Sequence, residues 1–175
     1  MQGQALPPQI LMPVYNVHER LIQASVGAAG ELLDNLASPD DRLWPSDRWP
    51  AIRFDRPLML GAKGGHGPIR YFVEAYTPGR SIRFRFTAPR GFDGTHSFEV
   101  EEVRAGVVRL RHTLRMNVRG PARLSWPLAF RWLHDALIED ALDRAEAQLG
   151  GGAYARQQKW SWRVRVLRQA AASLL

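Results

Sequence analysis

The sequence predicts an α+β fold in which a curved antiparallel sheet is covered by one long C-terminal helix. Between residues 57 and 118, short segments of alternating apolar and charged residues are separated by turn signals, as in antiparallel strands. From Pro121 to Leu149 the apolar period changes to 3.6, which is typical of an amphipathic helix. A sheet that is apolar on one face must have that face covered, so the helix is expected to lie on it.

Composition limits the classes of protein that fit. A chain of 175 residues with 45% apolar residues can bury one sizeable core. The formal charge of +7 is concentrated in residues 153–175, which hold five basic residues and no acidic one, so the rest carries only +2. A nearly neutral body argues against a nucleic-acid-binding module. The chain lacks cysteine, a convincing signal peptide and any bilayer-spanning stretch, so we expect a cytoplasmic protein without disulfides.

The first 60 residues are expected to form one strand, one short helix and a turn-rich cover. Residues 14–24 read as a strand, and Ser25 is placed to cap a helix that Pro39 stops. The following segment, "DRLWPSDRWP", is expected to bury Trp44 and Trp49 against the core. The alternative for these two rings is a gate at the mouth of a pocket.

Five further strands are expected in succession. "PLMLGAK" (57–63) precedes a glycine-rich turn, "GGHGP", and "IRYFVEAY" (69–76) ends at a Thr-Pro-Gly turn. The remaining strands are 80–88, 94–104 and 106–120, with a tight turn near Ala105 between the last two. Such spacing favours an antiparallel meander over βαβ units.

The last of these strands, "GVVRLRHTLRMNVRG", contains a histidine among its apolar residues. Its even positions from 108 to 118 are apolar except for His112, and its odd positions are mostly arginine. Period two sends the two sets to opposite faces of the sheet. We expect the arginines to form a solvated ladder with glutamates of the neighbouring strand, the alternative being an anion-binding patch.

The predicted long helix carries a second inward histidine. At 100° per residue, His134 falls near the centre of the apolar side with Leu137, Ile138 and Ala141. The opposite side is acidic and consists of Asp135, Glu139, Asp143 and Glu146. Gly150–Gly152 is expected to end this helix or to act as a hinge.

This element order resembles the helix-grip (SRPBCC) superfamily, which includes START domains, Bet v 1 allergens and bacterial polyketide cyclases. The resemblance spans residues 14–149 and rests on "HGPIRYFVEAYTPGRSIRFRFTAP", "GFDGTHSFEV", "LRHTL" and "LHDALIEDALDRAEAQL". It implies a hydrophobic cavity between sheet and helix, used by known members to carry lipids or hormones or to cyclise polyketides. The expected organisation is an N-terminal lead (1–13), a helix-grip domain (14–150) and a basic extension (151–175).

The candidate site consists of residues expected to face that cavity. A turn at Ala105 would set Phe98 opposite His112 and make His96 its diagonal neighbour, while His134 approaches from the helix. Tyr71 can add a hydroxyl, with core packing as its alternative. The apolar wall is expected to comprise Phe84, Phe86, Leu114 and Met116.

Several roles remain open for these histidines. They can be packed core residues, polar anchors for a ligand, acid–base groups of a cyclase, aromatase or dehydratase, or a three-histidine metal site. We expect a small hydrophobic or amphipathic ligand, and no cofactor, metal or nucleic acid is assigned. The basic extension has an apolar side at Trp160, Val164 and Leu167, which suits its own domain, a homodimer partner or a membrane surface.

Overall fold

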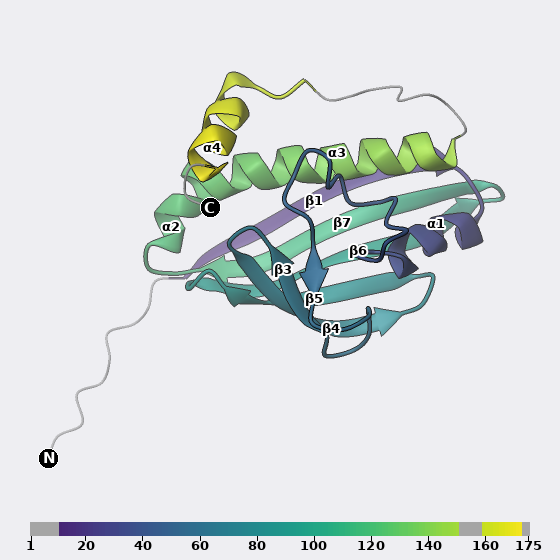
Figure 1. Cartoon of the computed structure of the whole chain (residues 1–175), viewed down its shortest axis with the longest axis horizontal. Coiled ribbons are helices and arrows are strands. Elements are labelled where there is room, and N and C mark those ends of the chain that lie inside the picture. Colours follow the sequence, from purple (N-terminus) through teal and green to yellow (C-terminus); the bar gives the residue numbers. More distant parts are fainter. Residues whose placement is uncertain (1–10, 151–158, 173–175) are drawn as a thin grey trace, which may run out of the picture.

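The computed structural model describes residues 11–150 and 159–172 and contains a seven-stranded antiparallel sheet in the order β1-β7-β6-β5-β4-β3-β2. A long C-terminal helix, α3, runs along one face of this sheet (Figure 1). The predicted α+β fold is confirmed. The strands are β1 (Met12–Gln23), β2 (Arg53–Phe54), β3 (Lys63–His66), β4 (Ile69–Thr77), β5 (Ser81–Ala88), β6 (Phe92–Arg104) and β7 (Val107–Val118).

The β6–β7 hairpin has the expected register. Its turn lies at Ala105–Gly106, where Gly106 adopts a φ of 74° that a residue with a Cβ rarely takes. Phe98 pairs with His112, which leaves His96 diagonal to His112 on the same face. The register follows from the alternation, because a shift by one residue would turn every apolar side chain to solvent.

The segment between residues 53 and 66 differs from the expectation. "PLMLGAK" is not a strand; instead β2 and β3 pair across the glycines that we predicted as a turn. A Cβ on Gly64 would lie 2.2 Å from the carbonyl oxygen of Arg53. These glycines therefore permit a close approach of two strands, a use that composition alone does not distinguish from a turn.

The predicted 121–149 helix is divided into α2 (Ala122–Ser125), a π-helical turn (Trp126–Phe130) and α3 (Arg131–Leu149). Pro127 has no N–H to donate to the preceding turn, and the Arg131 N–H bonds to Trp126. α1 (Val26–Asp34) begins as predicted, with the Ser25 hydroxyl accepting from the Ala28 N–H.

The core consists of two groups of buried apolar side chains. The larger group joins α1, α3 and the inner faces of β4–β7, and it includes Trp44 and Trp49, which are buried as predicted. The smaller group lies at the α2 end and is formed by Phe92, Leu114, Met116, Val118, Ala122 and Trp126. Within the described residues no helix has the length and apolar character needed to cross a membrane.

Candidate functional site

The three histidines predicted from the sequence lie in one continuous row of rings under α3. The ring centroids of His134 and His112 are 5.1 Å apart, and those of His112 and His96 are 5.5 Å apart. Tyr71 continues the row, with its ring 4.9 Å from that of His96. The structure thus brings together side chains from α3, β7, β6 and β4.

The polar atoms of this row are incompletely hydrogen-bonded. His112 Nε2 lies 3.4 Å from His96 Nδ1, which is a long contact. Four buried atoms of the row have no hydrogen-bond partner among the protein atoms described, namely Tyr71 Oη, His96 Nε2, His112 Nδ1 and His134 Nε2. A buried polar atom without a partner costs about 1–3 kcal/mol, so four in one place need an explanation.

The predicted apolar wall divides into two parts. Phe84 and Phe86 each place their ring 4.9 Å from that of His96. Phe84 belongs to the larger apolar group, whereas Leu114, which lies directly opposite His96 across the strands, belongs with Met116 to the smaller group, against which Phe86 also packs. The histidine row therefore passes between the two halves of the core.

Access to the row varies along it. His112 is 1% exposed, whereas His96 and Phe86 are only partly buried although both lie on the inner face of interior strands. The His134 side chain is 16% exposed even though it points from α3 toward the sheet. Part of the row is therefore not fully covered by the surrounding protein.

Burial keeps the inner imidazoles neutral. It lowers the pKa of His96 and of His112 well below 6.5, and neighbouring imidazoles act in the same direction. Burial also lowers the pKa of His134, against the opposing effect of Asp135, and raises the pKa of the Tyr71 hydroxyl. At neutral pH each imidazole can offer one donor and one acceptor nitrogen.

His66 belongs to the same ring system but was not predicted. Its ring lies 4.8 Å from that of Trp44 and 6.1 Å from that of Tyr71. Burial lowers its pKa to about 3, with smaller effects from His134 and Arg70. The sequence pattern predicts a turn at "GGHGP", and it therefore assigns no face to this residue.

His18 is a second histidine that the sequence prediction missed, and it lies between β1 and α3. Its Nδ1 is 2.6 Å from Glu139 Oε1, and its Nε2 is 3.2 Å from Asp135 Oδ1. Burial acts to lower the pKa of His18, but the hydrogen bonds and charges of the two carboxylates outweigh it and raise the pKa to about 9. The His18 ring also contacts that of His134, with centroids 5.9 Å apart.

The acidic side of α3 faces β1 and is not the solvent side that the helical pattern alone suggested. Arg20 lies two residues after His18, on the same face of β1. It forms ion pairs with Glu139, Asp143 and Glu146 at 2.7–3.0 Å. On β1 the inward positions are the even ones, so Asn16, His18 and Arg20 all point to the helix. The alternation in β1 indicates which of its residues face inward, but it does not indicate that they meet the acidic side of α3.

The described part of the C-terminal extension packs on the domain through Asp140. This buried carboxylate accepts hydrogen bonds from Trp49 Nε1 at 2.7 Å and Trp160 Nε1 at 3.0 Å, and it pairs with Arg48 at 2.8 Å. α4 (Trp162–Ala172) follows, with Val164 buried. Residues 151–158 and 173–175 of the extension lie outside the described parts.

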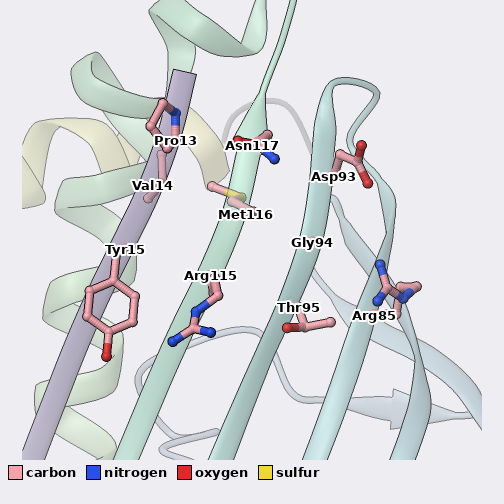
Figure 2. A pocket seen from close by; sticks show the side chains of 10 residues that line it. All are labelled: Pro13, Val14, Tyr15, Arg85, Asp93, Gly94, Thr95, Arg115, Met116 and Asn117. Carbon is pink, nitrogen blue, oxygen red and sulfur yellow. The ribbon is translucent and has the colours of Figure 1, made fainter. Parts of the chain in front are cut away.

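An open depression of about 770 Å³ lies on the opposite face of the sheet (Figure 2). Its lining includes outward side chains such as Tyr15, Arg85, Thr95 and Arg115, and the Arg115 guanidinium lies 5.2 Å from the Tyr15 ring. The sheet separates it from the histidine row. Other outward arginines form the expected ladder, as in the Arg109–Glu101 and Arg111–Glu19 pairs.

Comparison with known proteins identifies the fold. No family model matches the sequence, and the search of curated proteins found no significant match. CalU16 from Micromonospora echinospora is 12% identical with a TM-score of 0.54, over 96% of each chain. A conserved protein of unknown function from Enterococcus faecalis is 14% identical with a TM-score of 0.56, over 95% of this chain and 92% of that one.

Norcoclaurine synthase from Thalictrum flavum has the same arrangement, at 12% identity and a TM-score of 0.56, over 78% of this chain and 95% of that one. Identities this low, combined with coverage this broad, are informative about the fold and not about chemistry. The sheet order, the long covering helix and these similarities together show that the chain has a helix-grip fold.

Proposed function

We propose that this protein binds a small amphipathic molecule between the sheet and α3, with its polar groups held by the histidine row and its apolar part against Phe84 and Phe86. The observation that carries the proposal is the set of four buried, unpartnered polar atoms in a single row. A ligand with hydroxyl or carbonyl groups would supply their partners. Pockets for small molecules commonly combine apolar walls with a few such convergent polar groups.

The experiment is native mass spectrometry of freshly purified protein, followed by titration with the fluorescent amphiphile 1-anilinonaphthalene-8-sulfonate. We expect a co-purified small molecule or saturable binding of one dye molecule. The variant His112→Leu should weaken dye binding at least tenfold. The control Thr113→Val alters the neighbouring residue, whose side chain faces away from the row, and should bind like wild type. Equal binding by both variants, or none by the wild type, would contradict the proposal.

Acid–base catalysis is the second candidate, and the His96–His112 pair favours it. Two neutral imidazoles whose nitrogens lie 3.4 Å apart can accept and return a proton beside a bound substrate. The similarity of the fold to a named synthase, one structure of which holds a transition-state analogue, adds support. Incubating the co-purified molecule with fresh protein and analysing it for conversion separates an enzyme from a carrier.

For the C-terminal extension the proposed partner is an anionic membrane surface. Four large apolar side chains of α2, the π-helical turn and α4 are more than half exposed: Leu124, Leu128, Trp162 and Val166. Exposed arginines neighbour them in the sequence (Arg123, Arg163 and Arg165), and the Arg163 guanidinium lies 5.3 Å from the centroid of the Trp132 ring at the start of α3. Exposed apolar side chains next to basic ones suit the interface of an anionic bilayer. A homodimer through the same groups is the competing possibility.

A further inference from the structure

The seam between the edge strand β1 and α3 holds a polar group that shares only His134 with the proposed ligand site: the Nε2 atom of His134 belongs to the histidine row, and its Nδ1 atom lies 3.4 Å from Asp135 Oδ1. We propose that His18, His134 and Asp135 bind a divalent transition-metal ion of the zinc type. One donor atom of each residue lies within 4.8 Å of the donor atoms of the other two. Their side chains are 14%, 16% and 29% exposed, so the group is sheltered yet reachable from solvent.

The spacing of the donor atoms matches a shared metal ion. Asp135 Oδ1 is 3.2 Å from His18 Nε2 and 3.4 Å from His134 Nδ1. Two ligand atoms that each lie roughly 2.0–2.2 Å from zinc are roughly 3.0–3.5 Å apart at octahedral or tetrahedral angles. Two of the three donor-atom spacings therefore already suit one ion, and the donor atoms of His18 and His134 lie within 4.8 Å of each other.

The groups around the three ligands have the arrangement that metal-binding histidines require. His18 uses its other nitrogen to contact Glu139 Oε1 at 2.6 Å, and Arg20 holds the second oxygen of Glu139 at 3.0 Å. A carboxylate behind a histidine fixes its ring and strengthens it as a ligand. Asn16 Nδ2 donates to Asp135 Oδ1 at 3.0 Å, and Asn16 Oδ1, which is buried without a partner, adds a free oxygen beside the group.

The charge of the seam favours a divalent cation. Four carboxylates (Asp135, Glu139, Asp143 and Glu146) face two guanidinium groups (Arg20 and Arg131) in the network of ion pairs. With His18 neutral, this leaves an excess of two negative charges. A proton on His18 neutralises one of them, whereas a divalent ion neutralises both.

The donor set also limits which ion fits. Two imidazoles and one carboxylate suit zinc, cobalt, nickel or manganese, whereas calcium and magnesium prefer oxygen ligands only. His18 and His134 come from different elements, β1 and α3. A bound ion would therefore also tie the edge strand to the helix and raise the thermal stability of the protein.

The test uses the full chain after dialysis against a chelator. Isothermal titration with Zn²⁺, and the visible absorption of a Co²⁺ complex, should show one equivalent bound. His18→Gln and Asp135→Asn should each weaken binding at least about 100-fold, and Glu139→Gln about 10–100-fold with an unchanged Co²⁺ spectrum. His66→Gln removes a histidine outside the seam and should bind like wild type.

The proposal fails if the wild type binds neither ion more tightly than millimolar, or if His66→Gln weakens binding as much as Asp135→Asn does. Asp135→Asn preserves side-chain shape, so it decides the outcome if His18→Gln does not fold, which circular dichroism reveals. Dye titration of the metal-free protein tests the ligand site separately. If the wild-type protein binds the dye but no metal ion, the metal site is overturned and the proposed ligand site is not.

Discussion

His96 and His112 face each other diagonally across the β6–β7 hairpin, with the Nδ1 atom of His96 3.4 Å from the Nε2 atom of His112. The opposite nitrogens, His96 Nε2 and His112 Nδ1, are buried without partners. The pair therefore combines a weak internal contact with two unused hydrogen-bonding positions. A pair that existed only for stability would be expected to make better use of them.

Replacing His112 should show whether this histidine stabilises the fold. We expect the ligand-free His112→Leu variant to have a free energy of unfolding within about 1 kcal/mol of wild type or above it, because an unpartnered buried atom is removed. Urea denaturation measures the change. The control Leu110→Ala lies on the same strand, makes apolar contacts only and should lose about 2–5 kcal/mol. A loss of more than about 2 kcal/mol in His112→Leu would indicate a structural histidine.

The stability of the protein should fall as the pH is lowered from about 6.5 toward 5. The folded protein keeps His66 neutral because its pKa is about 3, whereas the unfolded chain takes up a proton near 6.5. The unfolded state therefore binds more protons between these values, and protonation favours unfolding. His96 and His112 act in the same direction.

The contribution of His66 is measured by urea denaturation at pH 7, 6 and 5. Each such histidine contributes a slope of at most about 1.4 kcal/mol per pH unit. The free energy of unfolding should therefore change less steeply with pH in His66→Gln than in wild type, by up to that amount. Identical slopes in the two proteins would show that His66 takes up a proton as readily in the folded protein as in the unfolded chain.

Asp140 should be essential for attaching the C-terminal extension. Asp140→Ala leaves Arg48 and two indole N–H groups without their common acceptor, so we expect a loss of about 3–5 kcal/mol. Hydrogen exchange should show faster exchange of the α4 amides than in wild type. The control Asp47→Ala removes an exposed partner of Arg144 and should cost less than about 1 kcal/mol. Unchanged exchange in α4 would show that other contacts hold this helix.

Binding to vesicles should depend on the exposed apolar side chains of α4. We expect wild-type protein to co-sediment with vesicles containing phosphatidylserine more than with pure phosphatidylcholine vesicles, and less so at high salt. Trp162→Glu combined with Val166→Glu should abolish the difference. The control Val103→Glu changes an exposed residue of β6 and should have no effect. If all three proteins partition equally, the α4 surface is not a membrane site, and sedimentation analysis would then test for a dimer.

The inner histidines could be predicted because the register of a hairpin is a local property. Strict alternation in β7 and a two-residue turn place His96 and His112 on one face, and helical spacing places His134 opposite them. The fold followed from the same patterns. The role of Leu114 and Met116 was less predictable, because alternation assigns a face but not a position along the core.

The sequence by itself determined the α+β class, the order of the strands from β4 onward and the apolar faces, because each depends on periodicity within one segment. Only the tertiary structure decided that the acidic side of α3 meets Asn16, His18 and Arg20 of β1. It also decided that His66 reaches Tyr71 from a glycine-rich strand. Both contacts join residues that are distant in the chain. They depend on how β1 lies relative to α3 and how β3 lies relative to β4, and no local pattern encodes these arrangements.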